Sequence, residues 1–344
     1  MPFKININEF LLLPYPIFDV RSPIEYNKGH IPEAINLPLF TNEERAIIGT
    51  AYFKQGRGEA IKIGLEKVQS KLVDFVESVN KIAKGQNIRL HCWRGGMRSQ
   101  NMAWLLETAG YKVYLLEGGY KSYRHYVLKY FEKEFSFIVI GGMTGVGKTE
   151  ILKLLESNSE QVIDFEGLAN HKGSVFGHLG QATQPTTEYF ENLIYNEISK
   201  FSVNKTIFIE DESISIGNVF IPNNLFKQIT NATKIIIQRR INERIKRLIS
   251  EYACYDKNEL ITSIKRIERR IGGDIVKYII TNIKNENYFD AISEILKYYD
   301  KLYKLNFNKT SLGKTTFLNI DELSNDEILN RLLLHSKKLN NGTN

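Results

Sequence analysis

The sequence is poor in cysteine. Its 344 residues contain two, Cys92 and Cys254, which lie in different halves of the chain. Two thiols so far apart argue against a disulfide framework and against a metal site built on thiolates, so we expect neither. Cys254 lies in an amphipathic stretch and is expected in a helical core. Cys92 is therefore expected to act as a single thiol.

The sequence also lacks a long apolar run. The longest, such as Phe137–Ile140 and Ile235–Ile237, are far shorter than the roughly 20 residues that span a bilayer. The N-terminus lacks the charged and then apolar pattern of a signal peptide. We therefore expect a soluble, cytoplasmic protein with no membrane partner. With 42% hydrophobic and 25% charged residues, the chain is globular and long enough for two cores.

Acidic residues are scarce in one segment. The formal net charge is +7, and residues 234–270 hold 11 Lys or Arg against 5 Asp or Glu. Most charge runs are solvated helical faces, so this segment alone does not establish a partner. It becomes the expected track for a phosphate backbone only if another feature of the chain requires RNA.

Short apolar strands alternate with helical stretches, which predicts an α/β fold with parallel sheets. In the first half we predict strands at 17–20, 88–91 and 113–116, and helices at 64–83, 99–107 and 120–133. A second α/β unit then begins with a strand at 135–140. Further strands are predicted at 161–164, 206–210 and 234–238, and the chain is expected to be mainly helical from 241. We place the boundary near residue 133, which gives domains 1–133 and 134–344.

The segment around Cys92 lies between a predicted strand and a predicted helix. Backbone N–H groups that open a helix converge on one point, where the helix dipole adds positive charge. Two glycines allow a tight curl, and two arginines favour the ionised thiolate, which is the nucleophile. A cysteine that only fills a core would not need these neighbours. We expect Cys92 to be catalytic and the bound anion to contact Arg94, Gly95, Gly96 and Arg98.

The spacing of this loop fits two kinds of enzyme. His-Cys, five residues and Arg-Ser is the pattern of cysteine phosphatases, whereas rhodanese-like sulfurtransferases hold a persulfide in a similar loop. Residues 19–26, 29–38 and 117–120 resemble the rhodanese signature. The loop is one residue longer than the common sulfurtransferase loop, which leaves a larger anion pocket, suited to phosphate or selenophosphate. The N-terminal domain is therefore expected to be rhodanese-like.

Residues 142–149 match the phosphate-binding pattern G-x-x-x-x-G-K-[ST] directly after a predicted strand. Such a loop binds a diphosphate, which need not belong to a nucleotide, and its Ser or Thr hydroxyl suits Mg²⁺. Asp211, at the end of the strand at 206–210, is our choice over Glu210 for the supporting carboxylate. The C-terminal domain is expected to be of the P-loop NTPase type, with a parallel sheet and a helical tail. The expected diphosphate contacts are Gly142, Thr144, Gly145, Gly147, Lys148 and Thr149.

A rhodanese module followed directly by a P-loop module resembles the tRNA 2-selenouridine synthases. The resemblance covers about residues 15–270 and includes the stretches 43–52, 168–174 and 210–217. It implies a transferase that alkylates wobble 2-thiouridine with geranyl diphosphate and then replaces the thiogeranyl group with selenium from selenophosphate. Both donors are substrates; no tightly bound cofactor is implied, and Mg²⁺ is an optional one.

The resemblance also implies partners: a tRNA, contacted at its anticodon arm, and a supplier of selenophosphate. His171 and Lys172 are then candidates for contact with the diphosphate. Trp93 is expected either to stack on the wobble base or to pack against the neighbouring helix. With RNA implied, the segment 234–270 becomes the expected phosphate track. The arginines expected to contact RNA are Arg239, Arg240, Arg244, Arg247, Arg266, Arg269 and Arg270.

Two other functions fit parts of the sequence. One is a rhodanese-fold cysteine phosphatase with a nucleotide-binding domain, which needs an aspartate general acid beside the leaving oxygen. The other is an RNA-binding protein that relays a persulfide on Cys92 without needing Lys148. Neither uses both loops for chemistry, as the synthase does.

Overall fold

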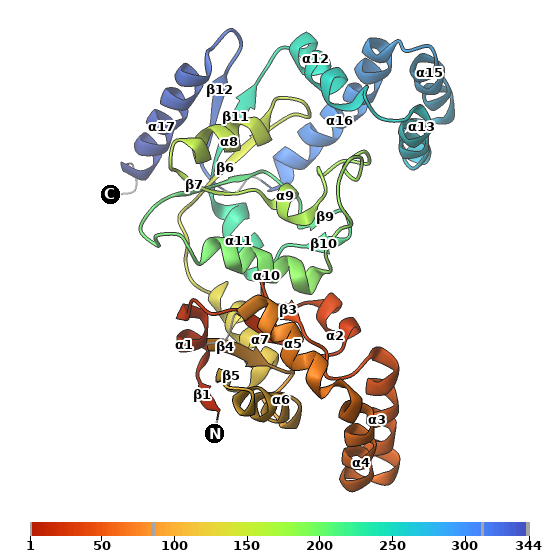
Figure 1. Cartoon of the computed structure of the whole chain (residues 1–344). Coiled ribbons are helices and arrows are strands. Elements are labelled where there is room, and N and C mark those ends of the chain that lie inside the picture. Colours follow the sequence, from red (N-terminus) through yellow and green to blue (C-terminus); the bar gives the residue numbers. More distant parts are fainter. Residues whose placement is uncertain (1, 84–86, 311–312, 342–344) are drawn as a thin grey trace. The chain divides into compact units, whose positions relative to one another are not determined.

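The structure is a computed structural model that describes residues 2–83, 87–310 and 313–341 (Figure 1). It divides into two compact units. The first comprises Met1–Tyr130 with Glu191–Leu193, and the second comprises Phe131–Phe190 with Ile194–Asn344. Each unit contains its own parallel sheet and is described by itself.

The sheet of the first unit has the strand order β1-β5-β4-β2-β3, and every pairing in it is parallel. Residues 88–91 of β4 are all buried, and because side chains alternate across a strand, both faces of the sheet are covered. β4 therefore lies in the hydrophobic core and ends directly before Cys92. The strands are β1 (Phe3–Ile5), β2 (Ile17–Asp19), β3 (Ile35–Asn36), β4 (Asn87–His91) and β5 (Lys112–Leu116).

One predicted helix of this unit, 64–83, is interrupted. α4 ends at Val68, a 3-10 turn follows at Gln69–Lys71, and α5 begins at Leu72. The turn lets α5 bury Phe75 and Val79 against the sheet, while α4 packs on α3 instead. The remaining helices agree with the expected α/β alternation. The helices are α1 (Ile7–Leu12), α2 (Pro23–Lys28), α3 (Asn42–Gln55), α4 (Arg57–Val68), α5 (Leu72–Ala83), α6 (Met97–Thr108) and α7 (Gly119–Tyr130).

The sheet of the second unit has the strand order β12-β11-β6-β8-β7, again parallel throughout. β6 is buried along its whole length and leads into the P-loop. The tail after residue 241 is mainly helical, as expected, but residues 315–319 form the edge strand β12 beside β11, which the sequence did not predict. The strands are β6 (Phe137–Gly142), β7 (Gln161–Ile163), β8 (Ile207–Glu210), β9 (Ser215–Ile216), β10 (Val219–Phe220), β11 (Thr233–Gln238) and β12 (Thr315–Asn319).

Helices α13, α15 and α16 share a hydrophobic cluster of their own, which explains the mainly helical segment after residue 241. Cys254 is exposed in the turn after α12, so its expected place in a helical core is wrong. No described helix is long and apolar enough to cross a membrane. The α/β prediction with two parallel sheets is confirmed. The helices are α8 (Lys148–Ser157), α9 (Phe165–Ala169), α10 (Thr187–Ile198), α11 (Asn223–Asn231), α12 (Ile241–Tyr252), α13 (Lys257–Lys265), α14 (Glu268–Ile271), α15 (Gly273–Lys284), α16 (Tyr288–Thr310) and α17 (Asn325–Asn341).

Candidate active sites

Cys92 lies at the carboxyl end of the central strand β4, in the loop that opens α6. This is the edge at which open parallel sheets bind ligands. The thiol is buried, and the Ser99 hydroxyl lies 3.2 Å from its sulfur, within reach to donate a hydrogen bond. Gly96 is the N-cap of α6, so the first N–H groups of the helix are directed toward this loop. The geometry is that of an anion site with a sulfur atom at its base.

A second turn holds the cysteine loop from behind. The backbone N–H of Tyr120 donates to the carbonyl of Cys92 at 2.8 Å, and that of Lys121 to the carbonyl of Trp93 at 2.9 Å. Gly119 makes this approach possible, with a φ of 60°. A Cβ there would lie 2.4 Å from the Cys92 carbonyl oxygen. The glycines of residues 117–120 therefore fix the position of the thiol.

Two arginines beside the thiol are held by one carboxylate. Arg98 donates to both oxygens of Glu25, at 2.6 and 3.2 Å, and Arg45 Nε lies 3.7 Å from the same group. Burial raises the pKa of Glu25, but the hydrogen bond and charge of Arg98, with Ser22 and Arg45, outweigh it and lower that pKa. Arg94, in contrast, is exposed. Glu25 thus holds the Arg98 and Arg45 side chains in place beside the cysteine loop, a role that the spacing of residues in the sequence did not indicate.

Asp19, in the stretch that resembles the rhodanese signature, has a structural role. Its carboxylate is fully buried and accepts several hydrogen bonds from Arg21, whose guanidinium also contacts the Gly29 carbonyl and lies 3.8 Å from the centre of the Tyr120 ring. Burial lowers the pKa of the neighbouring His91, which is also fully buried. Asp19 is therefore not free to serve as the general acid that a cysteine phosphatase needs, and His91 supports the loop.

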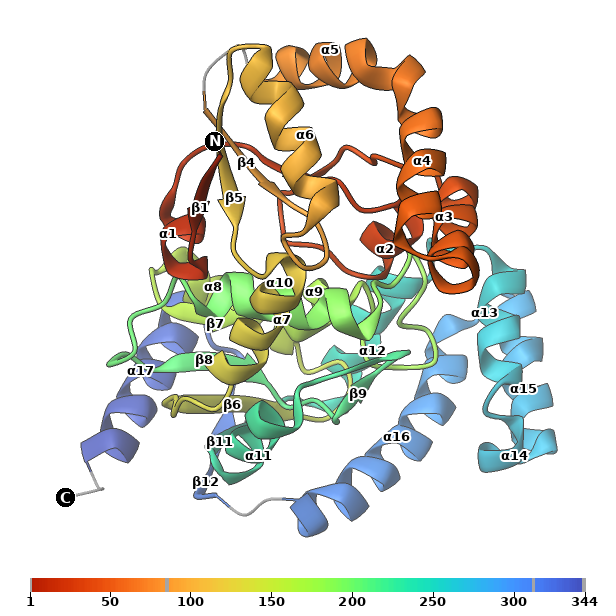
Figure 2. The same cartoon turned by 90° about the horizontal axis from the view of Figure 1, so that it is seen from below.

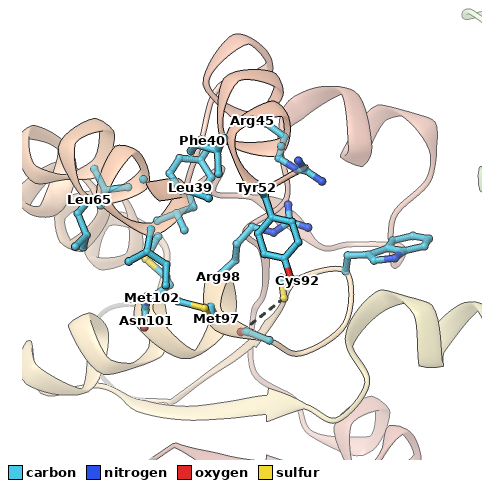
Figure 3. A pocket seen from close by; sticks show the side chains of 18 of the residues that line it. Leu39, Phe40, Arg45, Tyr52, Leu65, Cys92, Met97, Arg98, Asn101 and Met102 are labelled. Carbon is cyan, nitrogen blue, oxygen red and sulfur yellow. Dashed lines mark hydrogen bonds between the residues drawn. The ribbon is translucent and has the colours of Figure 1, made fainter. Parts of the chain in front are cut away.

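A cavity of about 880 Å³ opens beside Cys92 (Figure 3). Part of its wall is cationic, from Arg45, Arg57, Arg94 and Arg98, and no described residue that lines it is acidic. The rest is mostly apolar and comes from α3, α4, α5 and α6. Trp93 lines it too and packs against Tyr120, with ring centres 5.8 Å apart. Arg45 and Tyr52 belong to the stretch 43–52, which the family resemblance included without assigning it a role.

The P-loop has the conformation its glycines predict. β6 ends at Gly142 and α8 begins at Lys148, while Gly142, Gly145 and Gly147 have φ values of 146°, 83° and 95°. Only glycine adopts these angles without strain. The loop is also tied from outside, because the Arg244 side chain donates to the Thr144 carbonyl at 2.8 Å. The expected diphosphate contacts from Gly142 to Thr149 therefore lie in one turn before a helix N-terminus.

Carboxylates surround the P-loop lysine. Lys148 Nζ lies 3.7 Å from Glu212, and Glu166 donates its backbone N–H to Glu210 at 2.8 Å. Burial lowers the pKa of Lys148, but Glu212, Glu166 and Glu210 together outweigh it and raise that pKa. Burial, with the charge of Glu212, raises the pKa of Glu166 to about 8. Burial also raises the pKa of Glu210, one of whose oxygens has no hydrogen-bond partner among the described residues.

The turn at 171–174 packs on this acidic group. A Cβ at Gly173, where φ is 67°, would lie 2.7 Å from Glu166 and 3.0 Å from Glu212. The fold therefore joins the stretches 168–174 and 210–217 into one site. Lys172 pairs with Glu251 at 2.7 Å. Burial lowers the pKa of His171, and its Nδ1 has no hydrogen-bond partner among the described residues.

Asp211, our choice for metal support, accepts a hydrogen bond from the buried Lys234 at 2.8 Å. Among the described residues, no group of three or more His, Cys, Asp or Glu side chains is arranged to hold a metal ion. A P-loop magnesium site does not need three such side chains, since Mg²⁺ is usually held by one or two protein oxygens, substrate phosphates and water. Thr149 and one nearby carboxylate are a donor set of that kind.

The structure divides the expected RNA arginines into three groups. Arg244 is buried and paired with Asp300, so its expected exposure to RNA is wrong, because it anchors the P-loop. Arg247 pairs with Glu150 and lies against Gly147, also at the P-loop. Arg240 pairs with Glu322, and Arg239 is partly buried. The third group lies at the end of α13 and in α14, where the basic side chains are exposed and have no ion pair with a described residue. We call it the α13–α14 basic cluster: Lys265, Arg266, Arg269 and Arg270.

Comparisons with known proteins match the rhodanese-like and the P-loop parts of the chain separately. The model of the rhodanese-like domain matches residues 6–126, and that of the tRNA 2-selenouridine synthase AAA domain matches residues 135–323. A tRNA 2-selenouridine synthase of Sulfurovum sp. (strain NBC37-1) is 34% identical over 88% of this chain and 92% of its own length. That of Shewanella sediminis (strain HAW-EB3) is 33% identical over 89% and 91%.

Among solved structures, the N-terminal domain of a Clostridium difficile 630 protein is 45% identical over 36% of this chain and 98% of its own, with a TM-score of 0.34. The relatives match nearly the whole chain and thus both loops, the one at Cys92 and the one at Lys148. The chain accordingly belongs to the tRNA 2-selenouridine synthases, a family of tRNA-modifying enzymes.

Proposed function

We propose that this enzyme converts wobble 2-thiouridine in a tRNA anticodon to 2-selenouridine in two steps, using geranyl diphosphate and then selenophosphate. The observation that carries the proposal is the presence of two unlike anion loops in one chain. In the P-loop, Lys148 lies beside carboxylates. In the cysteine loop, the Cys92 thiol lies beside arginines and an apolar cavity. A phosphate-binding lysine suits departure of a diphosphate, and a thiol loop suits a soft selenium donor.

The first step takes place at the P-loop. The sulfur of 2-thiouridine attacks C1 of geranyl diphosphate, so a C–S bond forms and the C–O bond breaks. The electron pair leaves with diphosphate, and N3 of the base loses its proton to solvent. Lys148 and the N–H groups of residues 142–149 stabilise the charge that develops on the leaving oxygen. Arg247 lies against Gly147, and in the proposed step it exchanges its partner Glu150 for the diphosphate and so adds a second cation. A bound Mg²⁺ would add further charge stabilisation, with Thr149 and Asp211 as the proposed support.

The second step takes place at Cys92. The selenium of selenophosphate attacks C2, a C–Se bond forms, and the C–S bond breaks. Its electron pair leaves on the geranyl thiolate, which takes up a proton. Water then cleaves the P–Se bond, releasing phosphate and leaving 2-selenouridine protonated at N3. Alkylation makes the sulfur a good leaving group, which is why the first step must precede the second. Arg98, Arg94 and Arg45 bind the anionic donor, and Cys92 faces its selenium.

The proposed RNA contacts follow from exposure and charge. The α13–α14 basic cluster offers four cations to a phosphate backbone, and Trp93 offers a ring to an unstacked base. Since the donor must be made elsewhere, the enzyme is also expected to depend on a supplier of selenophosphate.

The test uses a 2-thiouridine anticodon stem-loop incubated with both donors and analysed by nucleoside mass spectrometry. Wild-type protein should yield 2-selenouridine. Cys92→Ala should stop at the S-geranyl nucleoside, and Lys148→Ala should leave 2-thiouridine unchanged. If wild-type protein leaves the RNA unaltered with both donors present, the proposal is wrong. If the two variants fail at the same step, the division of labour between the loops is wrong.

A further inference from the structure

The cavity beside Cys92 is much larger than a tetrahedral anion needs. Its volume of about 880 Å³ lies in the range of pockets that take drug-sized molecules. The two kinds of wall are separated in space. Figure 3 shows Tyr52 and Arg98 near Cys92, with Arg45 beside Arg98, whereas Leu65 lies far from the thiol on the other side of the cavity. An anion at the arginines would leave the apolar part unfilled.

The apolar part carries side chains that proteins seldom leave exposed. Leu65 and Trp104 are 63% and 66% exposed, and both line this one cavity. Exposed hydrophobic side chains gathered around a hollow mark a binding site for an apolar group. Small residues widen the space, since Gly64 and Ala60 face it from α4. The lining therefore fits a flexible hydrocarbon chain that ends next to a charged centre.

We infer that this cavity holds the S-alkyl chain of the alkylated nucleoside during exchange for selenium, with the C–S bond beside Cys92 and the isoprenoid chain along α4 and α6. The inference rests on the proposed function, which supplies an alkylated sulfur as the leaving group. The inference adds the place of the isoprenoid chain and names the cavity lining as the feature that selects it. The thiol that departs is as apolar as the lining, so the cavity also keeps it out of water while the C–S bond breaks.

The same lining chemistry suits the isoprenoid chain of geranyl diphosphate, whose phosphates would meet the arginines. We assign the cavity to the S-geranyl nucleoside because the Cys92 thiol lines it and the residues of the P-loop do not. The two sources of the chain can be separated directly, since both tryptophans of the sequence, Trp93 and Trp104, line this cavity. Intrinsic tryptophan fluorescence of the full chain therefore reports on its occupancy.

The first measurement titrates the full-length protein with S-geranyl-2-thiouridine, S-methyl-2-thiouridine or geranyl diphosphate. We expect the S-geranyl nucleoside to change the emission saturably and to bind at least about 10-fold more tightly than the S-methyl nucleoside. Leu65→Asp places a charge in the apolar part, away from Cys92, and should weaken binding of the S-geranyl nucleoside at least about 10-fold. Phe53→Asp is the matched control, because Phe53 is 91% exposed on α3 and does not line the cavity.

The second measurement follows selenouridine formation from an RNA that already carries S-geranyl-2-thiouridine, which bypasses the P-loop step. Leu65→Asp should slow this reaction, and Phe53→Asp should not. Equal binding of S-methyl and S-geranyl nucleosides, equal effects of the two variants, or tighter binding of geranyl diphosphate would each overturn the inference. Failure of the proposed function looks different, because wild-type protein would then form no selenouridine from either RNA.

Discussion

The cysteine loop and the P-loop have the same backbone plan and opposite surroundings. Each follows a buried strand at the middle of a parallel sheet and opens a helix. The thiol has arginines and an apolar cavity beside it, whereas Lys148 is bordered by Glu166, Glu210 and Glu212. The backbone therefore provides an anion site in both places, and the side chains decide which anion chemistry follows. If the two loops act separately, a change beside one of them should leave the step at the other unaltered.

The largest effect should come from Gly119→Ala. The new Cβ would meet the Cys92 carbonyl at 2.4 Å, and backbone there cannot yield without moving the thiol. We expect selenouridine formation from S-geranyl RNA to fall about 100-fold, as for a reacting group displaced by about 1 Å. Geranylation of 2-thiouridine RNA should be unchanged.

Gly110→Ala is the matched control for that variant. Gly110 also has a positive φ, 93°, but a Cβ there meets nothing within 4 Å. This change adds backbone strain without a collision. If it slows selenouridine formation as much as Gly119→Ala does, strain and not displacement of the loop is the cause.

A smaller effect is expected when the cationic wall is loosened. Glu25→Gln removes the charge that holds Arg98 and Arg45, so the KM for selenophosphate should rise about 10-fold, with little change in the KM for geranyl diphosphate. Steady-state kinetics on the two RNA substrates separate these constants. A rise in both would show that the anion sites are coupled.

Glu166, beside the P-loop, and Glu25, beside the cysteine loop, should respond to pH in opposite directions. The pKa of Glu166 is raised to about 8, so the folded state holds a proton that the unfolded state has lost. Its contribution to stability falls as pH rises from about 5 to 8. The pKa of Glu25 is lowered, so its contribution is present above its ordinary pKa near 4.5 and is lost as pH falls below it.

Denaturant unfolding between pH 3 and 9 tests this contrast, with tryptophan emission reporting on the unit that holds Cys92 and hydrogen exchange of residues 165–174 reporting on the other. Glu166→Gln should flatten the high-pH decline by at most about 1.4 kcal/mol per pH unit. Glu25→Gln should flatten only the low-pH decline. The same slope change in both variants would contradict the assigned pKa directions.

The smallest effect concerns RNA. Arg269→Ala removes an exposed cation without an ion pair in the described residues, so affinity for an anticodon stem-loop should fall a few-fold, and the salt slope should fall by about 0.7–0.9. Arg240→Ala, whose partner Glu322 already neutralises it, should change both less. Filter binding at several salt concentrations measures the slopes, and equal changes would count against the α13–α14 basic cluster.

The sequence predicted what short-range patterns encode. Both loops are local motifs between a strand and a helix, so the positions of Cys92 and Lys148 and the α/β class followed from spacing alone. β12 was missed because its partner, β11, lies about 80 residues earlier, and pairing at that distance leaves no local pattern. Arg244 could not be told apart in the sequence from the exposed arginines near it, because its partner Asp300 lies 56 residues later in the chain.

The cavity was beyond prediction for a related reason. Its lining comes from α3 and α4 on one side and α6 on the other (Figure 2). The 3-10 turn at Gln69–Lys71, which separates α4 from α5, leaves no mark in the apolar spacing of residues 64–83. Glu25 likewise lies 73 residues from Arg98, so their ion pair could not be anticipated from either segment.

The raised pKa of Glu166 couples proton binding to anion binding at the P-loop. A group with a pKa of about 8 is poised to exchange a proton near neutrality, and an arriving polyanion raises that pKa further. If the P-loop binds diphosphate as proposed, binding should draw a proton from the buffer and release should return it. In calorimetry, the apparent heat of diphosphate binding should change with the ionisation enthalpy of the buffer, and affinity should increase as the solution becomes more acidic. The carboxylates around Lys148 would thus act as a proton reservoir that fills and empties with each turnover.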